Sequence, residues 1–594
     1  MFGIGLISLL QVWFLPGLCL LVFSKKLKFI DKLLLSLPLS ITINYILIFF
    51  LVLLKSYNQI TLSILIFIET LIIIFFSKNN IDTTNSIMKF LSFIETKKFK
   101  FNIDLIDVII AVIFLIYLFI AIANIGNVIG IGDPITYYNW TLSIVDNKIP
   151  TKTYDYPLGA AILNSISFIL LNTLEIEFFT ASVFLVQPLW IFLIFYRLVF
   201  LLKKFERVIK FSLIFVSVII LYNFRHYLLY INLPDATVAI SSIIGAYILI
   251  LCLKYIKIGF NIETILFCFV MAFSSTLKQV GAYTSILFPL MYLIFFYKND
   301  KNVFKNFFFI SITIFFIIAP WYLFKLYQSF IYGFSDFSIY RTAVLYNNYD
   351  NIFIHIINIL RRLFFGYGFL VILLLIFISL KDKIAQKIFF VFILPFFLAY
   401  TFLFGYEFRA FAPVMGSVGI ICGIGLNILI DNLKKNLQKR QILFLYKSIL
   451  CFSFILSLFS INELRNFEKL KYLNTQAIKK RGDYELNVLL YNFLTVDDKI
   501  KTVYVIRDFN NLNLLPEISH KFINLSCFDF AKNYKENITK SYYVLTDKRE
   551  TNSIKEKIFC KKNFFEIIEN INEKMNIKKI FEYKNYILYL REYK

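Results

Sequence analysis

Acidic, basic and aromatic residues gather in five short stretches of this sequence, each beside a long apolar run. Carboxylates accept protons or hold metal ions, cations neutralise phosphate, and aromatic rings stack on the apolar faces of sugars. If the fold brings such side chains together, they would support group transfer from a phosphorylated donor. The stretches are "IGDPITYYNW" (131–140), "TYDYPLG" (153–159), "NFRHYLLYINLPDAT" (223–237), "LKQVGAY" (277–283) and "YEFRAFAP" (406–413), and the candidate residues are Asp133, Asp155, Asp235, Glu407, Arg225, Lys278, Arg409, Tyr137, Tyr138, Trp140 and Tyr156.

Each of these residue types also has a purely structural explanation. Lys and Arg near helix ends often extend to the membrane surface, and Trp and Tyr form belts at that surface. An acid has no comparable anchoring role, so acids near apolar runs point to function more directly. Asp133, at the end of a long apolar stretch, is therefore the first candidate.

The composition predicts a membrane protein. Hydrophobic residues make up 59% of the 594 residues and aromatic residues 19%, whereas a soluble domain is usually ~45–50% apolar. Several runs reach the ~20 residues that a helix needs to cross a bilayer, and helices are expected because backbone groups in lipid must pair within their own segment. The first run lacks the features of a cleaved signal peptide, so we expect it to be retained. Runs of this length include 3–24, 31–54, 104–123, 178–200 and 411–430.

The formal net charge of +24 is distributed in a way that predicts topology rather than a nucleic-acid partner. Seven short loops carry 25 Lys and Arg residues, and the intervening loops on the other side carry ten. Basic loops remain cytoplasmic during insertion, so the five stretches with candidate residues are predicted outside. The basic loops are 24–32, 78–100, 203–210, 254–257, 298–305, 381–387 and 434–440.

Two apolar runs, 157–173 and 178–200, separate the predicted outer Asp133 loop from the predicted inner loop 203–210. Only one of them can cross. The run 157–173 is short, begins Pro-Leu-Gly and contains Asn, Ser and Ser, so we expect it to lie along the outer surface. Residues 124–177 then form one large outer loop, and the chain has about 14 transmembrane helices with both termini outside.

The sequence after residue 460 differs from the rest. Short β-like stretches at 502–507, 541–546 and 586–591 alternate with helical patterns, which predicts an extracytoplasmic α/β domain at 461–594. We therefore expect three parts: N-terminal transmembrane helices at 1–103, a transmembrane catalytic part at 104–460, and this C-terminal domain.

Other ionisable and sulfur-containing residues give weaker signals. Glu69 lies within a predicted span, where it would pair inside the bundle or belong to an ion path. The His and Cys residues show no zinc-binding spacing, and a requirement for a divalent metal cannot be read from the sequence. Cys527 and Cys560 fall in the predicted exported domain. The sequence leaves open whether a disulfide joins them.

In their order and sidedness, the five stretches resemble the GT-C glycosyltransferases, which include the protein O-mannosyltransferases and the aminoarabinose transferases. The resemblance covers about residues 104–460. It implies that Asp133 is the catalytic acid of the first outer loop, that Asp235 is a second acid that helps hold a metal, and that Lys278 and Arg409 bind the donor phosphate. The tail lacks a "WWDYG"-like motif, which disfavours oligosaccharyltransferase activity.

These observations predict an inverting glycosyltransferase of the bacterial inner membrane. Its donor would be a polyprenyl-phosphate-linked sugar, and its acceptor would be a glycan, lipid or protein on the periplasmic side. Membrane lipids would surround it, and no nucleic acid is expected. Arg225 would join the phosphate-binding cations, and the aromatic residues with Asp155 and Glu407 would contact substrate. Two alternatives remain: an O-antigen polymerase or ligase, and a lipid-linked sugar flippase that forms no bond.

Overall fold

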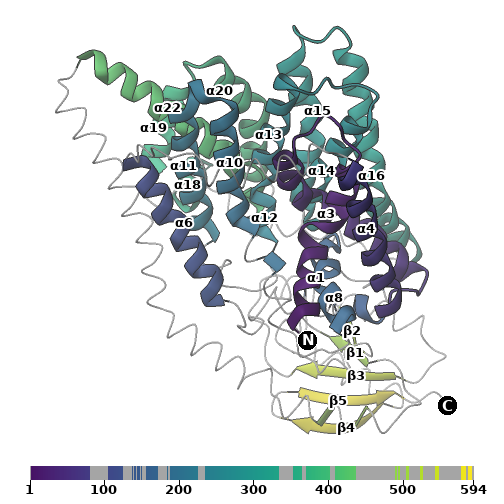
Figure 1. The fold of residues 1–594 in the computed structure, drawn as a ribbon. Helices are drawn as coiled ribbons and strands as arrows, with labels where there is room; N and C mark the ends of the chain where they lie inside the picture. Colours follow the sequence, from purple (N-terminus) through teal and green to yellow (C-terminus); the bar gives the residue numbers. More distant parts are fainter. Residues whose placement is uncertain are drawn as a thin grey trace.

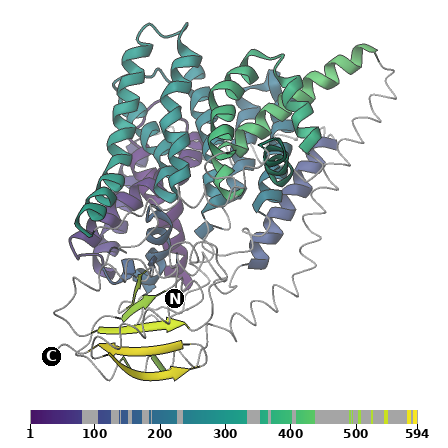
Figure 2. The ribbon, with the colours of Figure 1, turned by 180° about the vertical axis from the view of Figure 1, so that it is seen from behind.

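The fold is taken from a computed structural model of the chain. A helical bundle carries a small β-sheet at one end, and both views show this arrangement (Figures 1 and 2). The structure describes residues 2–79, 105–124, 137, 140–141, 143–147, 149, 156–171, 183–184, 187–224, 234–332, 352–363, 369–401, 408–436, 489–490, 493–494, 503–506, 522–525, 542–547, 577–583 and 586–591.

The first four helices form one side of the bundle, where α2 and α4 pack against each other and α1 and α2 both contact α3. A bend of 48° separates α1 from α2. The bend follows from Pro16, which lacks the N–H that would continue the helical hydrogen bonding. Gly17 then packs so tightly that an added Cβ would lie 2.2 Å from the Ser36 carbonyl oxygen. These helices are α1 (Phe2–Trp13), α2 (Leu15–Leu21), α3 (Phe29–Leu53) and α4 (Gln59–Asn79).

A short helix, α8 (Gly159–Leu171), corresponds to the predicted surface helix, but protein covers it. It packs against α1, α3, α4 and α14, and all of its residues except Leu171 are buried. Its serines do not need water, because Ser165 Oγ donates to the Ile162 carbonyl and Ser167 Oγ to the Asn164 carbonyl. α8 is thus surrounded by protein, and its position along the outer surface of the membrane remains a prediction. At 13 residues, α8 is also shorter than a membrane span.

The remaining helices pack around α22 (Ala412–Asn436), which contacts α11, α12, α13 and α19. Glycines let its neighbours approach closely: an added Cβ would lie 2.5 Å from the Ser212 nitrogen at Gly423, and 2.1 Å from the Leu375 oxygen at Gly425. The other elements are α6 (Leu105–Asn124), η1 (Gln187–Leu189), α10 (Trp190–Leu201), η2 (Lys203–Phe205), α11 (Glu206–Phe224), α12 (Asp235–Ala239), α13 (Ser241–Lys254), α14 (Ile262–Leu277), η3 (Gln279–Gly281), α15 (Ala282–Phe296), α16 (Val303–Tyr332), α18 (Ile352–Leu363), α19 (Phe369–Ser379), α20 (Lys383–Ile388), η5 (Phe389–Ile393), α21 (Leu394–Ala399) and η7 (Phe408–Phe411).

Hydrogen bonds gather the short lysine-rich connections at one end of the bundle, here called the basic end. Ser24 Oγ lies 3.2 Å from Glu263 Oε1, and Asn306 Nδ2 donates to the Ile258 carbonyl at 3.1 Å and to Asp300 at 2.7 Å. These bonds join the connections that follow α2, α13 and α15. Because α3 and α14 start there, their last residues lie at the opposite end of the bundle.

That opposite end, here called the site end, is held by polar contacts around Tyr57 in the turn between α3 and α4. The Tyr57 N–H donates to Asn147 Oδ1 at 2.9 Å, and its hydroxyl lies 2.9 Å from Ser165 Oγ of α8. Gln59 Nε2 donates to the Leu170 carbonyl at 2.9 Å. The turn and α8 therefore form one packed unit.

Within the described residues, six helices are long and apolar enough to cross a membrane, or seven if the bent pair α1 and α2 forms one span. This confirms a polytopic helical membrane protein. The total of about 14 spans remains a prediction, as does the placement of both termini outside. The predicted span 442–460 and most of the predicted outer loop lie outside the described residues.

The described strands of the C-terminal part form a five-stranded mixed sheet in the order β2-β1-β3-β5-β4. β1 pairs in parallel with β2 and β3, with Val503 opposite Phe522 and Tyr543, and β5 pairs antiparallel with β3 and β4. Three of these strands match the predicted ones within a residue. The extracytoplasmic location of this part remains a prediction. The strands are β1 (Val503–Ile506), β2 (Phe522–Leu525), β3 (Tyr542–Asp547), β4 (Ile577–Tyr583) and β5 (Tyr586–Arg591).

Candidate functional site

Two of the predicted site residues, Asp235 and Lys278, form a buried ion pair at the site end. Lys278 Nζ bonds Asp235 Oδ1, and the two side chains are only 3% and 1% exposed. The second carboxylate oxygen, Oδ2, is buried and has no hydrogen-bond partner among the described residues. A buried oxygen that lacks a donor is costly, so its environment is incomplete without a proton, a water or a bound group.

Local sequence places the two residues at helix ends. Asp235 begins α12 directly after Pro234, and α12 continues through a turn into α13. Lys278 follows α14 with extended backbone angles (φ −154°, ψ 143°), which stop the helix at that residue. Both side chains therefore leave the ends of apolar helices and meet in the core.

A tight turn after Lys278 holds this residue in position. The Lys278 N–H donates to the Ser274 carbonyl at 3.1 Å, and Ser274 Oγ donates to the Gly281 carbonyl at 2.8 Å. An added Cβ at Gly281 would lie 2.1 Å from the Ser274 carbonyl oxygen, so a side chain there would displace the turn. Gly281 thus has a packing role next to Lys278, the candidate functional residue.

Three of the predicted aromatic residues lie beside the Asp235–Lys278 ion pair. Lys278 Nζ lies 5.5 Å from the ring centroid of Tyr156, within the range of a cation–π contact. The Tyr156 centroid is 6.3 Å from those of both Tyr137 and Trp140, which lie 5.1 Å from each other. Tyr156 stays close to Lys278 because Gly159, three residues later, packs onto the Thr276 backbone.

The arrangement combines a carboxylate, an ammonium group and aromatic walls in a buried environment. A lysine ammonium has three N–H donors, and Asp235 occupies one of them. The other two are suited to an anionic oxygen, and the free Asp235 oxygen is suited to a hydroxyl group. Electrostatic contacts are stronger here than in water because the surroundings are apolar.

The remaining predicted site residues differ in what the structure says of them. Arg409 is buried in η7, which packs on α11 and on the start of α22. The others, Asp133, Tyr138, Asp155, Arg225 and Glu407, lie outside the described residues. Their roles remain predictions.

No group of three or more His, Cys, Asp and Glu side chains suited to a metal ion occurs among the described residues. Asp133, Asp155 and Glu407 are not part of that set. A divalent metal at Asp235 therefore remains a prediction that depends on residues beyond the described part.

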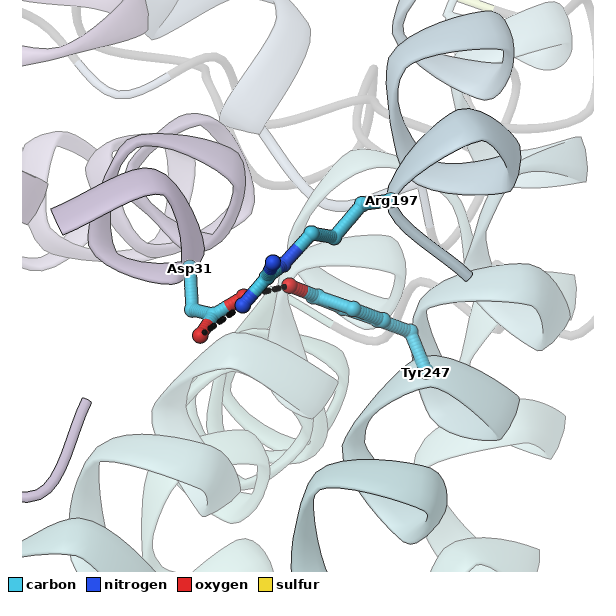
Figure 3. A network of polar contacts seen from close by, with 3 residues as sticks. All are labelled: Asp31, Arg197 and Tyr247. Carbon is cyan, nitrogen blue, oxygen red and sulfur yellow. Dashed lines mark hydrogen bonds and ion pairs between the residues drawn. The ribbon is translucent and has the colours of Figure 1, made fainter. Parts of the chain in front are cut away.

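The structure also contains a polar network that the sequence analysis missed. Arg197 binds both oxygens of Asp31, at 2.6 and 2.9 Å, and the Tyr247 hydroxyl donates to Asp31 at 2.6 Å (Figure 3). The network joins α3, α10 and α13 at the basic end. An arginine within the predicted span 178–200 was the available signal, because charge inside a span usually has a partner.

Fold and buried groups together define a polytopic helical membrane protein with a polar site at one end of its bundle. No protein-family model and no curated protein matches the sequence. Two solved structures of ArnT from Cupriavidus metallidurans are similar. The one bound to undecaprenyl phosphate has a TM-score of 0.49 at 8% identity, and the apo one 0.45 at 9%; each match covers 81% of this chain and 97% of that chain. ArnT is an aminoarabinose transferase, a group that the sequence motifs resemble.

Proposed function

We propose that the protein is an inverting glycosyltransferase of the GT-C type, which moves a sugar from a polyprenyl-phosphate donor to an acceptor on the outer face of the membrane. One observation carries this proposal: the buried Asp235–Lys278 pair, with its free carboxylate oxygen, faces the aromatic group of Tyr156, Tyr137 and Trp140. A phosphate, a hydroxyl and a sugar face are the groups that these side chains recognise.

In the proposed reaction, the acceptor hydroxyl oxygen attacks C1 of the sugar while the bond from C1 to the phosphate oxygen breaks. The hydroxyl proton passes to a carboxylate, and polyprenyl phosphate leaves with the bonding electrons. Asp133 is proposed as the proton acceptor. Lys278 and Arg409 would stabilise the charge that grows on the leaving phosphate.

The ion pair gives Asp235 a second part in this scheme. Lys278 must divide its three N–H donors between Asp235 and the donor phosphate. A phosphate bound at Lys278 weakens the hold of the ammonium on Asp235, which leaves the carboxylate better able to orient the acceptor hydroxyl. Tyr156, below the ammonium, keeps Lys278 in place during this exchange.

The distribution of charge supports a proposed orientation of the protein. The lysine-rich connections lie at the basic end. The proposed reaction takes place at the site end. If the basic end is cytoplasmic, as expected for basic loops, the reaction takes place on the outer face. We propose the cell inner membrane as the location.

The test measures sugar transfer in membrane vesicles that contain matched amounts of wild-type protein or of the Asp133→Asn variant. Polyprenyl phosphates that carry labelled glucose, galactose, mannose or N-acetylglucosamine are supplied in turn. The amount of labelled sugar that leaves the donor lipid is measured. Loss of general-base assistance should slow transfer by about 10²–10⁴-fold. Asp300→Asn at the basic end is the matched control and should transfer normally.

Full activity of Asp133→Asn would contradict its catalytic role. A wild-type protein that moves labelled lipid between leaflets, without forming a glycosidic bond from any donor, would instead indicate a flippase.

A further inference from the structure

Tyr283 is a half-buried aromatic residue that follows closely after Lys278, and the proposed sugar transfer gives it no role. Only the turn η3 and one further residue separate the two. The Gly281 N–H donates to the Lys278 carbonyl at 2.9 Å. On either side of this turn, Ser274 Oγ lies 2.9 Å from Thr284 Oγ1. The connection is tight, so a displacement of Tyr283 is passed on to Lys278.

The Tyr283 side chain contacts η5, the segment between α20 and α21. Its hydroxyl donates to the Phe392 carbonyl at 2.7 Å, and its ring centroid lies 5.3 Å from that of Phe392 and 4.5 Å from that of Phe396. η5 is a π-helix, a wide turn that is rare in proteins and often occurs at functional sites. Tyr283 thus joins the start of α15 to an unusual turn, through both its hydroxyl and its ring.

Ring contacts continue from this segment to η7, which contains Arg409. The Phe411 ring centroid lies 6.0 Å from that of Phe396, within the range of an aromatic pair. Phe411 is fully buried and ends η7, a helix of four residues. Because a 3₁₀-helix has about three residues per turn, Phe411 and Arg409 share one turn. The packing of Phe411 therefore helps to set the position of the Arg409 backbone.

These contacts form a path from Lys278 through Tyr283 and η5 to Arg409. We infer that Tyr283 is a positioning residue, which holds these two cations at the spacing that suits the donor phosphate. The inference rests on the proposed function, in which both cations bind that phosphate. Hydrogen bonds to phosphate depend on geometry, so a shift of about 1 Å in one cation weakens binding and slows the reaction.

A purely structural role of Tyr283 would have a different signature, and a second tyrosine of α15 provides the comparison. At the basic end, the Tyr292 hydroxyl donates to Asp300, and its ring stacks on Phe296 with the centroids 4.8 Å apart. Loss of either tyrosine removes a hydroxyl bond and a ring contact from the same helix. Only the loss of Tyr283 should change the binding of phosphate.

The first measurement is the Kd of purified full-length protein in detergent for undecaprenyl phosphate, a polyprenyl phosphate without a sugar, determined by native mass spectrometry. Tyr283→Leu removes the hydroxyl bond and the ring contacts. One cation should then lose its contact with the phosphate, and the Kd should rise about tenfold. Tyr283→Phe keeps the ring contacts, so its Kd should rise only about twofold to threefold. The control Tyr292→Leu should lower the Tm but bind with the wild-type Kd.

The second measurement tests whether Tyr283 acts through Arg409. In the Arg409→Gln background, Tyr283→Leu should change the Kd by less than about twofold, because the cation that Tyr283 positions is gone. With a wild type that binds the lipid, three results overturn the inference alone: wild-type binding by Tyr283→Leu, equally weakened binding by Tyr292→Leu, or an undiminished effect of Tyr283→Leu in the Arg409→Gln background. A wild type that neither binds undecaprenyl phosphate nor transfers sugar overturns the proposed function together with this inference.

Discussion

The two ends of the bundle each combine a buried aspartate with a cation and a tyrosine, but they use these groups differently. At the basic end, Arg197 bonds both oxygens of Asp31, and the Tyr247 hydroxyl adds a third bond (Figure 3). At the site end, Lys278 bonds one oxygen of Asp235 and leaves the other without a partner among the described residues.

The tyrosines differ as well. Tyr247 contributes its hydroxyl to the basic-end network, whereas Tyr156 contributes the face of its ring to Lys278. A complete set of hydrogen bonds fixes a structure, and an incomplete one leaves binding capacity. Asp31 is thus part of a fully bonded link between helices, whereas Asp235 keeps one oxygen without a partner among the described residues.

The largest effect is expected when the site-end pair is removed as a whole. In the double variant Asp235→Asn with Lys278→Met, no buried charge is left unpaired, so the fold should be retained. Sugar transfer should nevertheless fall by about 10²–10⁴-fold, because both the carboxylate and the phosphate-binding cation are lost. Transfer by the vesicle assay, at matched amounts of folded protein, checks this expectation. If the double variant transferred sugar at the wild-type rate, the Asp235–Lys278 pair would be structural, like the Asp31 network.

A stability effect is expected at the basic end. Asp31→Asn removes the buried partner of the partly buried Arg197, which should lower the free energy of unfolding by up to about 3–5 kcal/mol. Asp431→Asn breaks the exposed pair with Arg207 and should cost at most about 1 kcal/mol. Denaturant unfolding in detergent measures both. Equal losses in the two variants would remove the distinction between the buried network and a surface pair.

A smaller effect is expected at Tyr156. Tyr156→Phe keeps the ring under the Lys278 ammonium, and Tyr156→Leu removes it. The Leu variant should lose about 0.5–2 kcal/mol of stabilisation of that cation, seen as weaker donor use in the transfer assay. The Phe variant should resemble the wild type. If Phe is as impaired as Leu, the hydroxyl rather than the ring matters, and the contrast with Tyr247 fails.

The smallest effect concerns pH at the basic end. Burial raises the pKa of Asp300, but hydrogen bonds from Tyr292, Asn302 and Asn306 outweigh it, so the pKa lies below its usual value near 3.8. The stabilisation is therefore complete above that value and is lost as the pH falls through the depressed pKa. The Tm advantage of wild type over Asp300→Asn should be constant from pH 6 to pH 8 and should shrink below about pH 4. An advantage that grows at low pH would contradict this sign.

The sequence analysis located much of the site-end cluster. Asp235, Lys278, Tyr137, Trp140 and Tyr156 were selected from separate stretches, and the structure brings them together. Residue type and sidedness were enough to select them, because ionisable side chains at the ends of apolar helices usually face the bundle interior and pair with other polar groups. The pairing of Lys278 with Asp235 was not predicted, since it depends on how α12 and α14 pack.

Burial was harder to predict than position. Asn164, Ser165 and Ser167 suggested a helix along the outer surface, but the sequence did not show that other helices cover α8 and that its serine hydroxyls bond its own backbone. Arg197 was not recognised because a single arginine in an apolar run gives no indication of its partner. Such partners lie on helices distant in sequence, so periodicity cannot identify them.

α22 packs against its neighbours at glycines that leave no room for a side chain. This helix starts beside Arg409 at the site end and reaches Asp431, which bonds Arg207 near the start of α11, at the basic end. Gly423 and Gly425 leave no slack between α22 and its neighbours. A side chain added at Gly423 would therefore force α11 away from α22, and one added at Gly425 would force α19 away.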